Sequence, residues 1–533
     1  MPLARTHSVA LTGVTGYLIE VEVDIANGLV GMILVGLPDT ALREARDRIH
    51  AAIVNSREEW PQRKITVALS PASLPKRGSW FDLAIAIAIL TANGKIRQAA
   101  STGVMFFGEL GLDGRVRPVR GVLPAVAAAA RQGFGRVMVA SQNAEEALLV
   151  PGVRVIAAET LTQAADWLRG LPGPDGGPAA AEYGSAEELP NRNMPNGAGP
   201  EPSSPLGAQP GGAMPLDLAE LLGQSMARRA AEVCAAGGHH LSLLGPPGAG
   251  KTMLAERIPT ILPGLEREAA LEVTSIHSVA GNLPAQASLL KRPPFLAPHH
   301  TATKAAIVGG GSGVIRPGAA SLAHRGVLFL DEAPEFARDV LDALRQPLEA
   351  GEVTIARSGA ATSFPARFTL VLASNPCPCA RAAGPAEGCR CSPAARRRYL
   401  GRLSGPLLDR VDVKIELEPV SRRELLSDRS FSESSQTVAL RVAQARERTA
   451  HRLRDTPWRL NGEVPGSELR RTWPPAPGSL AVLERSLERG LITARGVVKV
   501  IRVAWTIADL AGRPRPARDD CHAALGLWLG VRR

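Results

Sequence analysis

The sequence predicts an α/β protein of several domains, and three observations support this prediction. Its 533 residues, 45% of them apolar, suffice for about three domains with cores of their own. Strand-like and helix-like segments alternate over residues 1–170, and a second region of this kind begins at residue 215. Residues 421–533 show helical apolar spacing instead. We therefore expect two α/β regions followed by a helical region.

The first region, residues 1–170, has enough apolar segments for a hydrophobic core of its own. The expected strands cover residues 17–25, 32–35, 65–70, 104–109 and 136–139. The expected helices cover residues 40–55, 81–92 and 123–132. Residues 171–214 are rich in Pro, Gly, Ala and Ser and contain few large apolar residues. Such a composition cannot bury enough surface to fold, so we expect a flexible linker there.

The second region, residues 215–418, contains the most specific motif of the chain. An apolar run at 241–244, the expected strand, leads into a Gly-rich loop, and 251–258 is the expected helix. The loop matches G-x-x-x-x-G-K-[ST] at every fixed position. Its residues are Gly245, Pro246, Pro247, Gly248, Ala249, Gly250, Lys251 and Thr252. Glycines let such a loop wrap a phosphate with its N–H groups pointing inward. Lys251 would reach the β- and γ-phosphates of ATP, and the Thr252 hydroxyl would bind Mg²⁺.

Two further apolar strands end in polar residues. The run at 327–330 ends in Asp331 and Glu332. Asp331 would hold Mg²⁺, and Glu332 would polarise the attacking water. The strand expected at 368–373 ends in Ser374 and Asn375, and Asn375 is placed to orient the water near the γ-phosphate. Alternatively, this pair caps a turn.

Two segments of this region are candidates for contact with nucleic acid. A Gly-rich insertion is flanked by Lys304 and Arg316, and it could contact a phosphate backbone or form a surface hairpin without a ligand. Residues 353–356 and 363–368 are expected to pair as a hairpin around Arg357. We interpret the adjacent pair His299–His300 as structural rather than metal-binding, because no acidic or Cys partner lies nearby.

Four of the six cysteines fall within fifteen residues, as two C-x-C pairs. They are Cys377, Cys379, Cys389 and Cys391, and four thiolates could hold a tetrahedral Zn²⁺. Free cysteines or a redox pair are the alternatives, and we favour structural zinc. The basic run 396–398 follows and forms either a solvated helix face or a nucleic-acid contact.

The helical region, residues 419–533, shows apolar spacing for helices at 436–454, 479–490, 493–511 and 518–529. Arg495 begins the third of these helices and could reach the γ-phosphate, or it could be a surface arginine. Arg410 lies between Asp409 and Asp412, just before a strand expected at 413–417.

Net charge and hydropathy limit which partners and which cellular location we expect. The net charge of +11 and the pI of about 9.8 favour a polyanionic partner. Only 8 of the 62 basic residues are Lys, so genome composition could account for part of this charge. The longest apolar run, 83–90, is too short to span a bilayer, and residues 1–19 show no secretory signal. We expect a cytoplasmic protein without a membrane partner.

One stretch of the first region resembles Lon-type proteases. Residues 75–80, PKRGSW, resemble their P-K-D-G-P-S stretch, and 108–121 resembles the later G-E-I-x-L-x-G-x-V-x-P-I-G-G. The position of the nucleophilic Ser falls on Trp80, and that of the catalytic Lys falls on Leu123. Because an unactivated Ser is a poor nucleophile, the resemblance implies a Lon-like fold without proteolysis.

Taken in order, the motifs of the whole chain resemble the YifB/ComM family of magnesium-chelatase-like AAA+ ATPases. They include GPPGAGKT, APHHT, RGVLFLDEAPEF, FTLVLASNPCPC, GPLLDRVD and TARGVVKVIRVAWTIADLAG. The resemblance implies an AAA+ core with a parallel sheet, a C-terminal lid of the magnesium-chelatase type, and homo-hexameric rings with ATP between subunits. It further implies that Arg410 is the arginine finger and Arg495 the sensor-2 arginine, with Arg502 as a competitor. The Arg357 hairpin would point into the ring's channel.

The leading hypothesis is a ring ATPase that moves DNA, since better-described family members drive branch migration during natural transformation. Such a helicase or branch-migration factor would bind single-stranded or branched DNA without sequence preference. One alternative is a magnesium-chelatase ATPase subunit, against which the Lon-like region and the four cysteines stand. A second is an ATP-dependent protease or protein-remodelling factor, which would have to act without the Ser–Lys pair. A third is a DNA-binding scaffold without ATP turnover, although the residues of an ATP site are all present.

Overall fold

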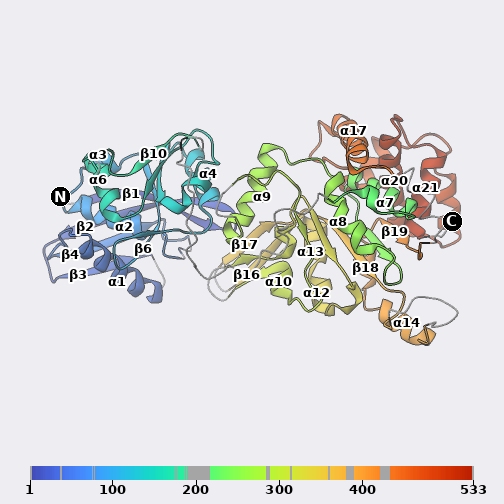
Figure 1. The fold of residues 1–533 in the computed structure, drawn as a ribbon, viewed down its shortest axis with the longest axis horizontal. Coiled ribbons are helices and arrows are strands. Elements are labelled where there is room, and N and C mark those ends of the chain that lie inside the picture. The colour runs from blue at the N-terminus through green and yellow to red at the C-terminus, as the bar shows by residue number, and fades with distance from the viewer. Residues whose placement is uncertain are drawn as a thin grey trace.

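The computed structural model describes residues 3–36, 39–74, 76, 78–173, 177–185, 188, 216–283, 288–311, 315–357, 360–379, 389–420 and 432–530. Figure 1 shows two sheets along the long axis, the first near the N-terminus and the second in the middle, with helices gathered at the C-terminal end. The expected α/β fold of several regions is confirmed.

The first sheet has eight strands in the order β10-β9-β8-β5-β1-β2-β4-β3. Its strands are β1 (Leu3–Thr12), β2 (Thr15–Ala26), β3 (Gly31–Val35), β4 (Lys64–Ser70), β5 (Val104–Phe107), β8 (Arg136–Ala140), β9 (Arg154–Ala158) and β10 (Ala181–Tyr183). Strand β1, which the sequence analysis did not include, pairs antiparallel with β2 and parallel with β5. In β2 alternate residues are buried, as expected for a strand with one face on the core.

Helices cover this sheet and complete its core. They are α1 (Asp39–Asn55), α2 (Asp82–Ala92), α3 (Gln98–Ser101), α4 (Val122–Arg131), the short η1 (Ser141–Asn143), α5 (Ala144–Ala147) and α6 (Leu161–Arg169). Helix α2 is apolar on all sides apart from Asp82 and Thr91, and every one of its residues is buried. A helix of this kind belongs inside a core rather than on a surface. The short strands β6 (Glu109–Leu110) and β7 (Val116–Arg117) pair beside it.

Strand β10 lies within the range predicted as a flexible linker. It pairs antiparallel with β9, and Ala179 and Ala180 before it are buried. An edge strand is held by backbone hydrogen bonds, and the Tyr183 side chain packs against the core, so this segment joins the sheet although few of its residues are large and apolar. The prediction is therefore wrong for these residues, and most of the remaining range, 189–214, lies outside the described residues.

The second sheet is parallel throughout, with the order β12-β15-β18-β11-β19. Its strands are β11 (Leu241–Leu244), β12 (Phe295–Leu296), β15 (Val327–Leu330), β18 (Thr369–Ser374) and β19 (Val413–Glu416). The three central strands match the expected apolar runs. Because the carboxyl ends of parallel strands share one edge, the loops after β11, β15 and β18 meet there.

Helices and small hairpins surround this sheet. The helices before and between its strands are η3 (Leu218–Glu220), α7 (Ser225–Gly237), α8 (Lys251–Ile261), α9 (Arg267–Ala280), α10 (Lys304–Val308), α11 (Ala319–Leu322), η4 (Ala333–Glu335), α12 (Arg338–Ala343), α13 (Arg345–Ala350), α14 (Pro393–Leu400) and α15 (Gly405–Leu408). Residues 338–350 thus form two short helices, α12 and α13. The hairpins are β13 (Gly309–Gly310) with β14 (Arg316–Pro317), and β16 (Glu352–Arg357) with β17 (Ala360–Pro365).

The C-terminal region is helical, as predicted. It comprises α17 (Ser435–Leu453), η5 (Asn461–Glu463), α18 (Gly466–Arg471), α19 (Ala481–Glu488), α20 (Ala494–Leu510) and α21 (Arg518–Leu529). Helix α17 packs against α7 and α8, so these helices share one hydrophobic core with the second sheet. Within the described ranges, we find no helix with both the length and the apolar character needed to cross a bilayer.

Candidate ATP site and the surfaces around it

The Gly-rich loop joins β11 to α8 in the geometry of an anion site. Gly248 and Gly250 have φ of +79° and +88°, a conformation that favours glycine. Helix α8 begins at Lys251, so its first N–H groups face the loop. The loop is anchored to the next strand, since the Gly245 N–H donates to the Ser374 carbonyl at 3.1 Å. The Ser374 hydroxyl is buried without a hydrogen-bond partner among the described residues.

Lys251 and Asn375 meet, as the prediction of one site requires. The Lys251 Nζ donates to the Asn375 Oδ1 at 3.0 Å and to the Gly245 carbonyl at 2.6 Å. Burial lowers the pKa of Lys251, while Asp331 and Glu332 act in the opposite direction. Hence the ammonium lies inside the loop beside the polar end of β18.

The two residues predicted to hold Mg²⁺ are also in contact. The Thr252 hydroxyl donates to the Asp331 carboxylate at 2.9 Å, and the other Asp331 oxygen accepts from the Glu332 N–H at 2.8 Å. Hydroxyl and carboxylate oxygens are the ligands that Mg²⁺ prefers beside nucleotide phosphates. The donor set at this edge therefore fits the metal that the motifs predict.

Glu332 lies at the end of β15 with an unusual neighbour. Its φ is +48°, a strained value for a residue other than glycine, and its side chain is half exposed. The His300 Nδ1 lies 3.3 Å from the Glu332 Oε2. The expectation that His299–His300 has no acidic partner is wrong, because β12 runs beside β15 and carries the following residues to the end of that strand. This contact could not be predicted from the sequence, because it depends on which strands are neighbours in the sheet.

Arg410 and Arg495 lie together on another face. Arg410 pairs with Glu349, and the Arg495 Nη1 lies 3.8 Å from the Asp409 Oδ2. Both arginines line a cavity of about 1690 Å³, and none of the residues of the Gly-rich loop is among the described residues around it. The predicted arginine finger and sensor-2 arginine are thus brought near each other. Arg502, the competitor, also lines the cavity, but it is largely buried and donates to the Val464 carbonyl.

A buried ion pair holds the Arg410 segment, and the sequence analysis missed it. The Lys499 Nζ, on α20, donates to the Asp412 carboxylate at 2.6 Å and to the Arg410 carbonyl at 2.8 Å. Asp412 also accepts from the His240 N–H, just before β11. Burial opposes ionisation of Asp412, but Lys499 and the neighbouring histidines overcome it and lower its pKa. This network joins the lid, the arginine segment and the strand that leads to the Gly-rich loop.

The three candidates for DNA contact come from neighbouring elements, α10, β14 and β16. Arg357 ends β16 and is paired with Ala360 in the register of the hairpin, as predicted. Lys304 begins α10, Arg316 is part of β14, and both are exposed. Strand β13 packs against β16, so the Gly-rich insertion and the Arg357 hairpin lie side by side.

The Lon-like stretch carries no catalytic pair at the family's positions. Trp80 and Leu123 occupy them, and both are buried apolar side chains. The Ser79 hydroxyl donates to Glu109, and the buried Lys76 Nζ donates to the carbonyl of Leu74 at 3.1 Å. Pro75 and Arg77 lie outside the described residues.

The four clustered cysteines converge in space. One candidate ligand atom from each of Cys377, Cys379, Cys389 and Cys391 lies within 4.8 Å of the others. The basic run forms part of α14, where Arg396, Arg397 and Arg398 are exposed.

The parallel sheet, the loop after its central strand and the acidic end of β15 define a P-loop ATPase module of the AAA+ class. Three family models match in succession: "Magnesium chelatase, subunit ChlI" over residues 217–425, "Subunit ChlI of Mg-chelatase" over 21–143, and "Magnesium chelatase, subunit ChlI C-terminal" over 432–527.

Full-length relatives give the family. An uncharacterized protein of Mycobacterium tuberculosis is 49% identical over 534 residues, covering 100% of both chains. Competence protein ComM of Haemophilus influenzae is 39% identical over 100% of this chain and 98% of its own, and the uncharacterized protein YifB of Salmonella typhimurium is 40% identical over 98% and 97%. The chain therefore belongs to the YifB/ComM family of magnesium-chelatase-like AAA+ ATPases.

Part of the chain is also similar to Lon proteases. The Lon protease of Trichlorobacter lovleyi is 27% identical over 152 residues, which are 27% of this chain and 18% of the protease. It agrees with the Lon-like character predicted for the first region.

Proposed function

We propose that this protein is an ATP-hydrolysing ring motor that acts on DNA in the cytoplasm, as a helicase or branch-migration factor for incoming DNA. The observation that carries the proposal is the chain path between β15 and β18. Both strands end at the ATP site, and the chain between them forms η4, α12, α13 and then the Arg357 hairpin, β16–β17. A change at the γ-phosphate would therefore reach the hairpin along the chain, through α12 and α13 or along β18. The relative ComM is named a competence protein, and this name supports a function that involves incoming DNA.

The roles of the site residues follow from their positions. Lys251 would bind the β- and γ-phosphates, and Asn375, which it contacts, would orient the water. Glu332 would accept the proton of the attacking water. Thr252 and Asp331 would hold Mg²⁺, which when bound neutralises charge developing on the phosphates.

The position of Arg410 supports an assembly of several copies, and we propose a homo-hexamer. Arg410 and Arg495 line a cavity separate from the Gly-rich loop of their own chain. In a ring, this arginine-bearing face would meet the ATP site of the next subunit. Both guanidinium groups could then stabilise the charge of a neighbour's nucleotide.

The contacts with DNA would be phosphate contacts. Arg357 and Arg316 come from two adjacent hairpins, Lys304 begins the helix α10 just before one of them, and six copies would surround one channel. Such contacts carry no sequence information, and binding should weaken steeply as salt rises.

The test is ATP turnover of the purified protein with single-stranded DNA, a four-way DNA junction, or casein. We expect DNA to raise turnover at low salt and casein to remain uncut. A protein that neither binds DNA nor responds to it would contradict the proposal, and casein cleavage would favour the protease alternative.

A further inference from the structure

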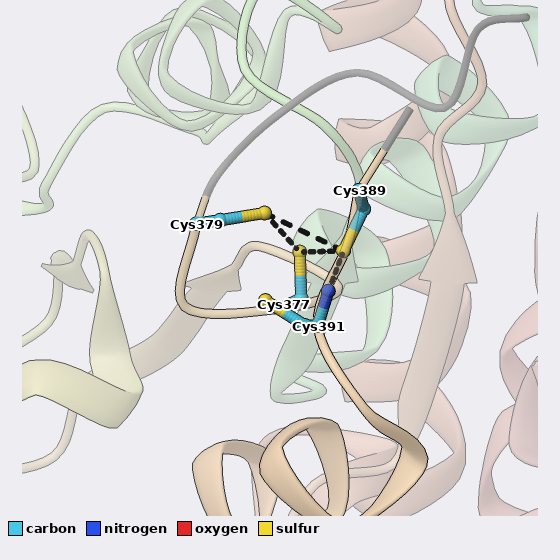
Figure 2. Close-up of side chains that lie close together, drawn as sticks. All are labelled: Cys377, Cys379, Cys389 and Cys391. Atoms are coloured by element: carbon cyan, nitrogen blue, oxygen red, sulfur yellow. Dashed lines mark hydrogen bonds between the residues drawn. The ribbon is translucent and has the colours of Figure 1, made fainter. Parts of the chain in front are cut away.

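The four clustered cysteines come from two chain segments that meet in space, one after β18 and one before α14 (Figure 2). The Sγ atoms of Cys377 and Cys379 lie 3.2 Å apart, and the Cys389 Sγ lies 3.2 Å from Cys377 and 3.4 Å from Cys379. The Cys391 N–H lies 3.4 Å from the Cys389 Sγ. The figure shows all four side chains directed to one point.

This geometry suits a single metal ion. All six cysteines are free thiols, so no disulfide accounts for the cluster. Four thiolates around Zn²⁺, each about 2.3 Å from the ion, lie about 3.8 Å from one another. The candidate ligand atoms of the four cysteines are compatible with this spacing, since all of them lie within 4.8 Å of one another. Sulfurs this close leave room for one ion rather than for a cluster of several irons.

Both ends of the cysteine segment are attached to the ATP site. Cys377 follows Asn375 by two residues and is buried. Beyond Cys391, α14 carries the buried Tyr399, whose hydroxyl lies beside the Asn375 backbone. The Arg402 Nη1 then donates to the Glu335 carboxylate at 2.7 Å, just past Glu332.

We propose that Cys377, Cys379, Cys389 and Cys391 form a structural Zn²⁺ site that fixes the loop after Asn375 against α14. A closed site of four thiolates contributes its binding free energy to folding. With zinc bound, Asn375 is held from both sides, by Cys377 along the chain and by Tyr399 across it. Zinc would thus keep Asn375 within reach of Lys251. The part of this proposal that concerns Asn375 rests on the proposed ATPase function, whereas zinc binding itself does not.

The direct test is metal analysis of the full chain, purified under reducing conditions without chelators. We expect about one zinc ion per chain and no stoichiometric iron. Cys379→Ser and Cys389→Ser should each lose zinc. Cys234→Ala and Cys521→Ala are matched controls, because these cysteines are buried outside the cluster, and they should retain zinc. Wild-type protein without zinc, or zinc retained in a Cys379→Ser/Cys389→Ser double variant, would overturn the site.

The second measurement separates this site from the proposed function. Zinc is removed from wild-type protein with a chelator, and both melting temperature and ATP turnover are measured before and after zinc is restored. We expect both to fall and then to recover. Unchanged turnover in zinc-free protein would overturn the role in holding Asn375. If zinc is present but wild-type protein turns over no ATP, the proposed function fails while the metal site stands.

Discussion

The ammonium of Lys251 is surrounded by neutral acceptors, the Asn375 amide oxygen and the carbonyls of Gly245 and Pro246. A partly buried cation held only by neutral acceptors gains more from a phosphate than from a carbonyl, because the phosphate adds the attraction between opposite charges. ATP binding should therefore depend on Lys251, whereas turnover should depend on Glu332.

We expect Lys251→Ala to lose ATP binding, and Glu332→Gln to bind ATP but turn it over about 10²–10⁴ times more slowly. The matched control is Asp339→Asn, since Asp339 is an exposed acid on the following helix, α12. Nucleotide binding and phosphate release, measured separately, check this. Near wild-type turnover in Glu332→Gln would remove Glu332 from the role of base.

Arg410 should act on the nucleotide of a neighbouring copy. We expect Arg410→Ala to bind ATP and hydrolyse it about 10³–10⁵ times more slowly, the range for arginine fingers. Mixing it with Lys251→Ala should restore some turnover, since some interfaces then join an intact loop to an intact arginine. Rings shown to be mixed that recover no activity would argue against action between subunits.

The residues of the ATP site could be predicted from sequence because their spacing is fixed by one loop and by strand ends. Lys251, Thr252, Asp331 and Asn375 all meet as expected. The contact of His300 with Glu332 could not be predicted, because it depends on which strand lies beside β15. Roles in hydrolysis and DNA contact remain predictions for all of these residues.

At the scale of elements, the lid helix α20 is tied to the arginine segment by the buried Lys499–Asp412 pair. Removing one partner of such a pair leaves an uncompensated buried charge, which costs about 3–5 kcal/mol. We expect Lys499→Met to lower the melting temperature clearly, in thermal unfolding of the purified protein.

Lys95→Met is the matched control for Lys499→Met, because Lys95 forms a solvent-exposed pair with Glu59. Exposed pairs contribute little to stability, so its melting temperature should stay close to that of the wild type. Equal melting temperatures for the two variants would mean that the buried pair does not hold the lid.

Most elements could be predicted because their apolar periods are clear, as for α21 and for the strands of the second sheet. Prediction failed where contacts between distant parts of the chain determine the secondary structure. Strand β10 has little apolar character and exists through pairing with β9. The helical segment 338–350 is divided at Leu344 into α12 and α13, which apolar spacing alone does not indicate.

At the scale of the whole molecule, the first region is attached to the ATPase region through α9. Helix α4 packs on α9, and the Ser278 hydroxyl donates to the buried Glu146. The opposite side of the ATPase region carries the lid (Figure 1). The Arg357 hairpin belongs to the central part, where both the ATP site and the proposed channel lie.

The central claim is that ATP hydrolysis moves DNA through contacts of this hairpin. The most direct measurement is migration of a synthetic four-way DNA junction by wild-type protein, Glu332→Gln and Arg357→Ala, with ATP at low salt. We predict that the wild type moves the branch point and that neither variant does. DNA should also cease to raise the ATP turnover of Arg357→Ala. Migration by Arg357→Ala at the wild-type rate would contradict the role of the hairpin, and a wild-type protein that leaves the junction unmoved would contradict the account as a whole.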